Sequence, residues 1–226
     1  MLDYTKRFWN PNGTFMHDKL KKWKRAPCRV SFGITPRWGN LERYAKLARN
    51  LPPDTLVRLG WEFNGPWNYY SVDPARIAQH WRGVVDVMRA ERDDLLFEWT
   101  FASDALDPRP YWPGEECVDV IGMDIYNVKG WWQHLRHPYG PVLHVTLAEQ
   151  YDKPMSFPEW GLVAVEKGGH GDNPRFIRQM ANWVKKHRKR VLYHAYFEFH
   201  CCMSDHRLKT SPRSAAAFKQ AFGKRS

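Results

Sequence analysis

VDVIGMDIY, residues 118–126, is the stretch of the sequence that decides the fold. Successive side chains of a β-strand point to opposite faces. Its aliphatic side chains therefore share one face: Ile121, Met123 and Ile125. The other face ends in Asp124 and Tyr126. An apolar face opposite a polar end is typical of a barrel strand, with helices outside and a polar site at the mouth.

Strand-like and helix-like stretches alternate along the rest of the chain. The predicted strands cover residues 29–34, 55–61, 95–101, 118–126, 154–159 and 191–199. The predicted helices cover residues 41–50, 74–91, 141–151, 173–189 and 212–222, with a further helix-like piece at 16–24. This alternation predicts a parallel sheet with right-handed crossovers. We expect an α/β fold of the (β/α)₈ TIM-barrel type, in one domain spanning residues 1–226. About six βα units are visible where a closed barrel has eight, so we expect the barrel to be incomplete.

Two segments, RLGWEFNG at residues 58–65 and PMSFPEWG at 154–161, contain the carboxylates Glu62 and Glu159. Strand alternation from Arg58 predicts that Glu62 faces the same side as Arg58, at the end of its strand. Catalytic residues of barrels cluster at the C-terminal ends of strands. If the fold brings the two carboxyl groups to about 5–5.5 Å, they can cleave a glycosidic bond with retention. The alternative is that both are structural carboxylates in ion pairs. Glu98 and Glu198 are further strand carboxylates, and each could be a substrate-subsite contact or an ion-paired structural group.

Three longer segments carry a family resemblance. LVRLGWEFNGPWNYYS is similar to the acid/base strand of glycoside hydrolase family 26, the β-mannanases and related endo-β-glycanases. YWPGEECVDVIGMDIYN resembles the sixth strand of that family. SFPEWGLV and the following GGHGDNPRFIRQMANWV resemble its nucleophile strand and the next helix. The similarity runs from about residue 31 to residue 199 and begins at the family's third strand, so we expect a chain truncated at its N-terminus.

The resemblance implies a retaining endo-β-glycosidase that acts on a mannan-like or related β-linked polysaccharide. Glu62 would be the acid/base and Glu159 the nucleophile. Arg58 would orient the nucleophile and hold it charged, and Tyr126 would donate a hydrogen bond to it. The full set of implied substrate-binding residues is Arg58, Asn64, Trp67, Trp99, Asp124, Tyr126, Trp131 and Trp160, with the four tryptophans as sugar platforms. The family usually has His before its acid/base Glu, and Trp61 at this position argues against a typical mannanase.

The net charge of +11 is concentrated in basic runs such as residues 19–25 and 185–190. Such runs attract polyanions or form solvated helix faces, and without a recognition motif the second interpretation is favoured. We therefore do not expect nucleic acid as a partner, while the resemblance implies a polysaccharide or oligosaccharide partner. The alternatives are a carbohydrate-binding protein that has lost catalysis and, with less support, a basic polyanion-binding protein.

The remaining expectations concern cofactors, compartment and assembly. Four cysteines, an adjacent pair and two singles, do not form a disulfide framework. His200, Cys201, Cys202 and His206 lack a recognised ligand pattern, so neither a metal nor a cofactor is predicted. No secretory signal and no membrane-spanning run is visible, and the compartment is not predicted. An uncovered sheet edge would favour self-association.

Overall fold

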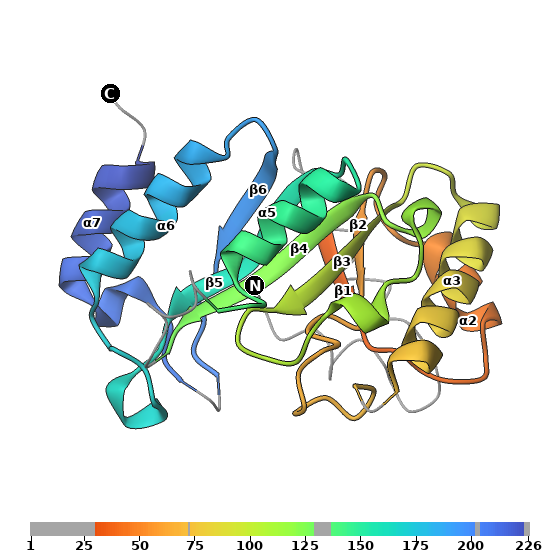
Figure 1. Cartoon of the computed structure of the whole chain (residues 1–226), viewed down its shortest axis with the longest axis horizontal. Coiled ribbons are helices and arrows are strands. Elements are labelled where there is room, and N and C mark those ends of the chain that lie inside the picture. The colour runs from red at the N-terminus through yellow and green to blue at the C-terminus, as the bar shows by residue number, and fades with distance from the viewer. Residues whose placement is uncertain (1–29, 72, 129–136, 202–203, 224–226) are drawn as a thin grey trace. The chain divides into compact units, whose positions relative to one another are not determined.

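The computed structural model describes residues 30–71, 73–128, 137–201 and 204–223, which form two compact units. The first unit ends at Gly122 and the second begins at Met123. Strands and helices alternate through both units (Figure 1). The predicted helix-like piece at 16–24 lies outside the described residues.

The first unit contains three parallel strands in chain order. Its elements are β1 (Ser31–Ile34), α2 (Glu42–Ala48), β2 (Leu56–Leu59), α3 (Pro74–Glu91) and β3 (Leu96–Ala102). In register, Ser31 lies opposite Leu56, and Leu56 lies opposite Leu96. Asp119 then exchanges two hydrogen bonds with Phe97, its N–H donating to the Phe97 carbonyl at 2.9 Å and its carboxylate accepting the Phe97 N–H at 2.7 Å. This exchange places the start of β4 (Val120–Asn127) beside β3.

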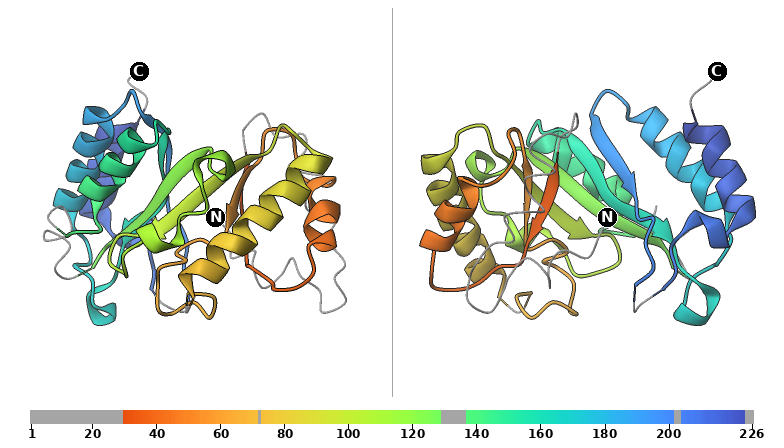
Figure 2. Two further views of the ribbon diagram at one scale, coloured as in Figure 1. Left: turned by 45° about the vertical axis from the view of Figure 1, so that its right-hand side comes forward. Right: turned by 180° about the vertical axis from the view of Figure 1, so that it is seen from behind.

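Helix α3 forms where its sequence predicts a helix. Asp73 accepts the backbone N–H of Arg76 as N-cap, and Pro74 occupies the first turn, where its missing N–H costs nothing. Its apolar face buries Trp81, whose indole N–H donates to the Cys117 carbonyl at 3.1 Å. Helices α2 and α3 lie side by side in both views of Figure 2.

The second unit contains the rest of β4 and two further strands, in the order β4-β5-β6. Its other elements are α5 (Pro141–Gln150), β5 (Met155–Leu162), α6 (Pro174–Lys186), β6 (Val191–Tyr196) and α7 (Pro212–Phe222). Strands β5 and β6 are parallel, with Met155 opposite Val191. Asn173 caps α6, as the sequence predicts, by accepting the N–H of Phe176. The α/β prediction is confirmed, and the helix bounds at Pro74–Glu91 and Pro212–Phe222 are those predicted.

The predicted strand at residues 55–61 is wrong at its C-terminal end. Strand β2 stops at Leu59, because Gly60 and Glu62 both have left-handed backbone, with φ of 57° and 52°. Strand alternation therefore cannot place Glu62, which lies in a turn beyond the strand. The predicted strand at 191–199 likewise ends early, at Tyr196.

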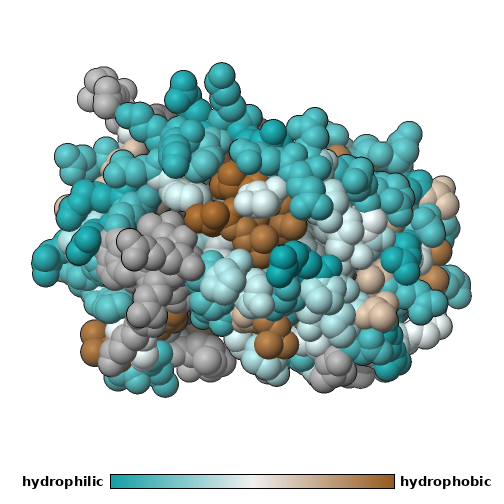
Figure 3. Space-filling model, in the orientation of Figure 1, coloured by the Kyte–Doolittle hydropathy of each residue, from teal (hydrophilic) through white to brown (hydrophobic). Residues whose placement is uncertain are grey.

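In the described part of the chain, no helix is long and apolar enough to cross a bilayer. Figure 3 shows hydrophobic side chains exposed over α5, where Val142 is 52% exposed. A single exposed apolar helix face of this kind is ordinary for a soluble surface and for an interface alike.

A hydrogen-bonded pair of the buried Tyr44 and the half-buried His80 joins α2 to α3. The Arg37 N–H donates to the Tyr44 hydroxyl oxygen at 2.8 Å, which leaves the hydroxyl proton for the His80 Nε2, 3.2 Å away. An imidazole nitrogen that accepts a hydrogen bond carries no proton, so the His80 ring in this pair is neutral. Burial lowers the pKa of His80, and the charge of Arg76 lowers it further, while burial raises the pKa of Tyr44 to about 12.

This pair predicts acid-sensitive stability. Between the lowered folded pKa of His80 and its unfolded value near 6.5, the unfolded state binds more protons, so the free energy of unfolding falls as pH drops through 6.5. One such group contributes at most about 1.4 kcal/mol per pH unit. We expect His80→Gln to reduce the stability lost between about pH 7 and pH 5 in urea unfolding. The same change at the exposed His170 should keep the wild-type dependence, and equal slopes for all three proteins would contradict the assignment.

Candidate active site

Glu62 lies in a tight turn that fixes its backbone. Its N–H donates to the Thr100 carbonyl of β3 at 2.9 Å, and its carbonyl accepts the Gly65 N–H at 2.8 Å and the Asn68 amide at 2.9 Å. A non-glycine residue in left-handed backbone costs about 1–3 kcal/mol and persists only where the surroundings enforce it. Such residues cluster at functional sites, so the strain at Glu62 supports a functional interpretation of its carboxylate.

Trp67 lies directly against that carboxylate. Its indole N–H donates to Glu62 Oε2 at 2.8 Å, and the side chain is 55% exposed. Gly65 permits this position, because a Cβ there would come within 2.3 Å of the Trp67 ring. An exposed indole held in place is a suitable platform for a sugar ring.

Arg58 is buried on β2, 2% exposed, and faces the buried Glu98 of β3. Their closest atoms, Arg58 Nε and Glu98 Oε2, are 3.8 Å apart, and the Arg58 Nε–H also donates to Thr100 Oγ1 at 3.4 Å. Ser31 donates to the same Glu98 oxygen at 3.4 Å. Of the two alternatives for Glu98, the structure shows the ion-paired one, since a buried guanidinium needs a counter-charge. The contact of Arg58 with Glu159 stays a prediction.

Asn64 is not the sugar contact that the resemblance implied. It is fully buried, and its amide donates to the carbonyls of Ala102 at 3.0 Å and Leu106 at 2.7 Å. Its carbonyl oxygen accepts the Ala102 N–H at 2.8 Å. Asn64 therefore fastens the turn of Glu62 to the end of β3 and presents no polar group to a ligand.

Glu159 is held in the second unit by two residues of β4. The Tyr126 hydroxyl donates to Glu159 Oε2 at 2.9 Å, and the Glu159 N–H donates to Asp124 Oδ1 at 3.0 Å. Asp124 is 1% exposed, and its carboxylate accepts a backbone N–H of β5; its contact with a sugar stays a prediction. The two side chains share one face of β4, as alternation predicts, and both reach Glu159.

Two of the predicted sugar platforms are core residues, which corrects the prediction for them. Trp99 is fully buried against Phe63 in the first unit, with ring centroids 4.7 Å apart. Trp160 is fully buried against Phe176 of α6 and Phe218 of α7. Neither ring has surface on which a sugar could stack. Trp131 lies outside the described residues.

The segment after β6 does not form a metal site in the described part of the chain, where no three His, Cys, Asp or Glu side chains are grouped for one. Glu198 accepts the Leu208 N–H at 2.8 Å, so this carboxylate, left open by the sequence, has a structural bond. His206 instead packs its ring against Tyr126, 5.2 Å away. The sequence suggests His206 only as a possible metal ligand, because nothing in its distance from Tyr126 along the chain indicates a contact with β4.

Comparison with known proteins identifies relatives. Residues 39–197 match glycosyl hydrolase family 26. No curated protein is significantly similar to the sequence. Among solved structures, an endo-β-1,4-mannanase from Bacillus sp. JAMB-750 has a TM-score of 0.60 at 18% identity, with 81% of this chain and 55% of that one covered. A β-mannanase from Bacteroides ovatus has a TM-score of 0.59 at 16% identity, with 81% and 56% covered.

A third similar structure, GH26C from Muricauda sp., has a TM-score of 0.60 at 17% identity, with 81% of this chain and 54% of that one covered. The chain thus spans about half the length of these structures. At such identity the likeness shows the fold alone. The described residues contain six strands, five of them followed by an α-helix, and they are similar to part of these structures, so the fold is an incomplete (β/α)₈ barrel of the TIM type, as predicted.

The bond between Trp67 and Glu62 is testable in solution. Alanine at Gly65 should push the indole off the carboxylate, because its Cβ would overlap the ring. We expect the Trp67 indole N–H resonance of Gly65→Ala to move to the position that it has in Glu62→Ala. Gly83→Ala, a helix position bordered by the flexible end of Leu41, is the matched control and should leave the resonance in place. An unmoved resonance in Gly65→Ala would disprove the contact.

The support that Asp124 gives to Glu159 predicts a difference between two substitutions. Asp124→Leu leaves the Glu159 N–H without its acceptor and should lower the free energy of unfolding by about 1–3 kcal/mol. Asp124→Asn keeps an acceptor oxygen at Oδ1 and should cost less than half as much. Urea unfolding of both variants measures this, and equal losses would show that the bond is not the source of the effect.

Proposed function

Because the chain belongs to glycosyl hydrolase family 26, we propose that it is a retaining endo-β-glycosidase that hydrolyses a mannan-like or related β-linked polysaccharide. The observation that carries the proposal is the fixed carboxylate of Glu159, which accepts a hydrogen bond from the Tyr126 hydroxyl at 2.9 Å. Glu159 lies in the segment that resembles the family's nucleophile strand. The second carboxylate, Glu62, is held by a strained turn and by Trp67.

In the first step, a Glu159 oxygen attacks the anomeric carbon while the bond from that carbon to the glycosidic oxygen breaks. Glu62, as a carboxylic acid, gives its proton to the departing oxygen. The product is a sugar linked covalently to Glu159. The hydrogen bond from Tyr126 fixes the orientation of the carboxylate before the attack, which lowers the entropic part of the barrier.

In the second step, Glu62 takes a proton from a water molecule, whose oxygen attacks the same anomeric carbon. The bond between sugar and Glu159 breaks, and Glu159 returns to a carboxylate. Two inversions give net retention. The proposal requires the two carboxyl groups to lie about 5–5.5 Å apart.

The substrate class follows from the surface near Glu62. Trp67 offers an exposed ring for a sugar face, as polysaccharide sites commonly do. Trp61 stands where the family usually has His. Its ring packs over Gly33, where a Cβ would lie only 3.3 Å from the ring. The indole can donate a hydrogen bond but has neither the acceptor nitrogen nor the titration of His, so we propose the broad class of β-linked polysaccharides rather than mannan alone.

A panel of β-linked polysaccharides, assayed for released reducing sugar, tests the activity. We expect Glu62→Ala to lower kcat/KM by about 10²–10⁴-fold, the range for loss of a general acid/base, and Glu159→Ala to abolish hydrolysis. Glu166→Ala, at an exposed glutamate of the second unit, is the control and should retain wild-type activity.

Azide rescue separates the two roles. With an activated aryl β-glycoside, azide should attack the free α-face in Glu159→Ala and give an α-glycosyl azide. In Glu62→Ala it should attack the glycosyl-enzyme and give the β-azide. Wild type that binds these polysaccharides and hydrolyses none would favour the carbohydrate-binding alternative, and full activity in either glutamate variant would refute the assignment.

A further inference from the structure

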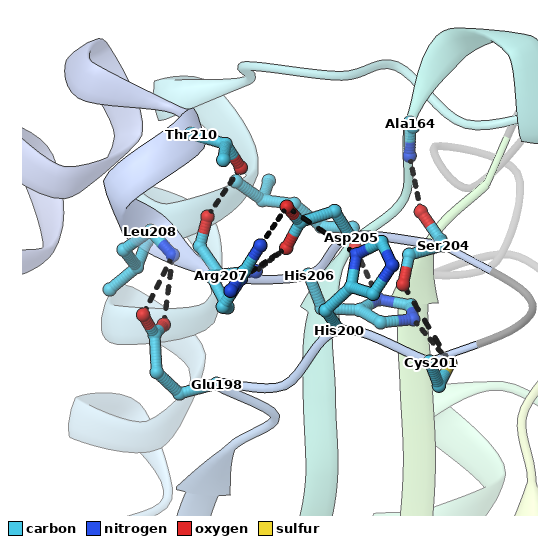
Figure 4. A network of polar contacts seen from close by, with 11 residues as sticks. Ala164, Glu198, His200, Cys201, Ser204, Asp205, His206, Arg207, Leu208 and Thr210 are labelled. Atoms are coloured by element: carbon cyan, nitrogen blue, oxygen red, sulfur yellow. Dashed lines mark hydrogen bonds and ion pairs between the residues drawn. The ribbon is translucent and has the colours of Figure 1, made fainter.

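The segment that follows β6 folds back onto the end of β5 in the second unit (Figure 4). The Ala164 N–H donates to Ser204 Oγ at 3.0 Å, which ties the residues after β5 to this segment. The His206 N–H donates to the Phe199 carbonyl at 3.0 Å. Arg207 is bonded twice to Asp205, which stiffens the segment beside His206.

A closed set of hydrogen bonds links His206 to Leu162, the last residue of β5 and three residues beyond Glu159. The Leu162 N–H donates to the Tyr196 hydroxyl oxygen at 3.4 Å, and that hydroxyl donates to the His206 carbonyl at 2.8 Å. His206 Nδ1 lies 2.6 Å from the Leu162 carbonyl. Because a carbonyl only accepts, Nδ1 carries the proton and donates it.

The other ring nitrogen of His206 faces a thiol. With Nδ1 protonated and the ring neutral, Nε2 is a hydrogen-bond acceptor. It lies 3.6 Å from Cys201 Sγ, whose single thiol proton also has the Ser204 carbonyl 3.7 Å away as an acceptor. Burial is the largest cause that lowers the pKa of His206, with a smaller contribution from His200, whereas the carboxylates of Asp205 and Glu159 oppose the shift. The ring is therefore neutral at neutral pH.

The His206 ring also supports Tyr126. It is 5% exposed and lies 5.2 Å from the Tyr126 ring and 5.2 Å from the Phe197 ring. Tyr126 is the hydrogen-bond donor to Glu159. One side chain thus contacts both supports of the Glu159 carboxylate: the end of its own strand and the tyrosine that donates to it.

We propose that His206 is a positioning residue for Glu159, which holds the end of β5 through Leu162 and holds the Tyr126 hydroxyl on the carboxylate through ring packing. The inference rests on the proposed function for its effect on catalysis, while the positioning itself is a property of the folded second unit. His206 contacts no reacting atom in this assignment.

Two substitutions separate the two contacts. His206→Asn keeps a donor near the position of Nδ1 but removes the ring that backs Tyr126. His206→Phe keeps a ring and removes the donor to Leu162. His200→Asn is the matched control, since this neighbouring histidine has a 63% exposed side chain and pairs with Asp205. Thermal unfolding of each variant confirms that it is folded.

We expect His206→Asn to lower kcat about tenfold on the polysaccharide with KM unchanged, because substrate binding is intact and the attacking group is misplaced. In a Tyr126→Phe background the same change should have little further effect, since the hydroxyl that it positions is gone. His200→Asn should match wild type. Equal losses in the presence and absence of the Tyr126 hydroxyl, or a rise in KM alone, would overturn the proposal.

A measurement without turnover keeps this inference separate from the proposed function. With 3-fluorotyrosine at position 126, the ¹⁹F resonance should move in His206→Asn in the direction that it moves in Glu159→Ala. If wild type hydrolyses no polysaccharide but this shift occurs, the positioning stands and the proposed function fails. If wild type is active and the resonance of folded His206→Asn and His206→Phe stays at the wild-type position, the positioning fails and the proposed function stands.

Discussion

The opposite orientation of two consecutive residues, Glu159 and Trp160, organises the second unit. Neighbouring residues of a strand usually point to opposite faces, and Glu159 and Trp160 do so although the pairing of β5 with β6 shifts register between Phe157 and Trp160. Trp160 is fully buried among aromatic side chains of α6 and α7. That burial fixes the register of β5, because a slip of one residue would bury a carboxylate and expose an indole. Glu159 is half-buried on the other face, where its carboxylate accepts a hydrogen bond from Tyr126 and its backbone N–H donates to Asp124.

The first unit fixes its carboxylate by a different physical device. No strand register holds Glu62, since β2 ends three residues earlier. A turn with left-handed backbone holds it instead, fastened by Asn64 and by the Glu62 N–H on Thr100. The buried pair of Arg58 and Glu98 joins the two strands, β2 and β3, that this turn follows and contacts. One glutamate is therefore placed within a strand, where the pairing of β5 with β6 is irregular between Phe157 and Trp160, and the other lies in a turn with left-handed backbone.

This difference explains what the sequence could and could not predict. The α/β alternation and the faces of Asp124 and Tyr126 follow from period-two patterns, and the structure has them. The face of Glu62 could not be predicted in that way, because a left-handed residue interrupts the period. Composition could not separate the exposed Trp67 from the buried Trp99, since the difference arises from Gly65 and from packing against Phe63. His206 reaches Tyr126 only through the tertiary fold, so no spacing in the sequence indicates it.

At Glu62, the residue type that would make the left-handed turn most stable differs from the residue type that the proposed reaction needs. Glycine adopts this backbone without the steric penalty that a side chain brings, so the conformation would be most relaxed in a chain that lacks the carboxylate. The glutamate is retained at an energetic disadvantage of about 1–3 kcal/mol, which the hydrogen bonds around the turn must offset. A search for more stable variants of this chain would accordingly select against Glu62, the residue proposed as acid/base, unless the screen also demanded turnover.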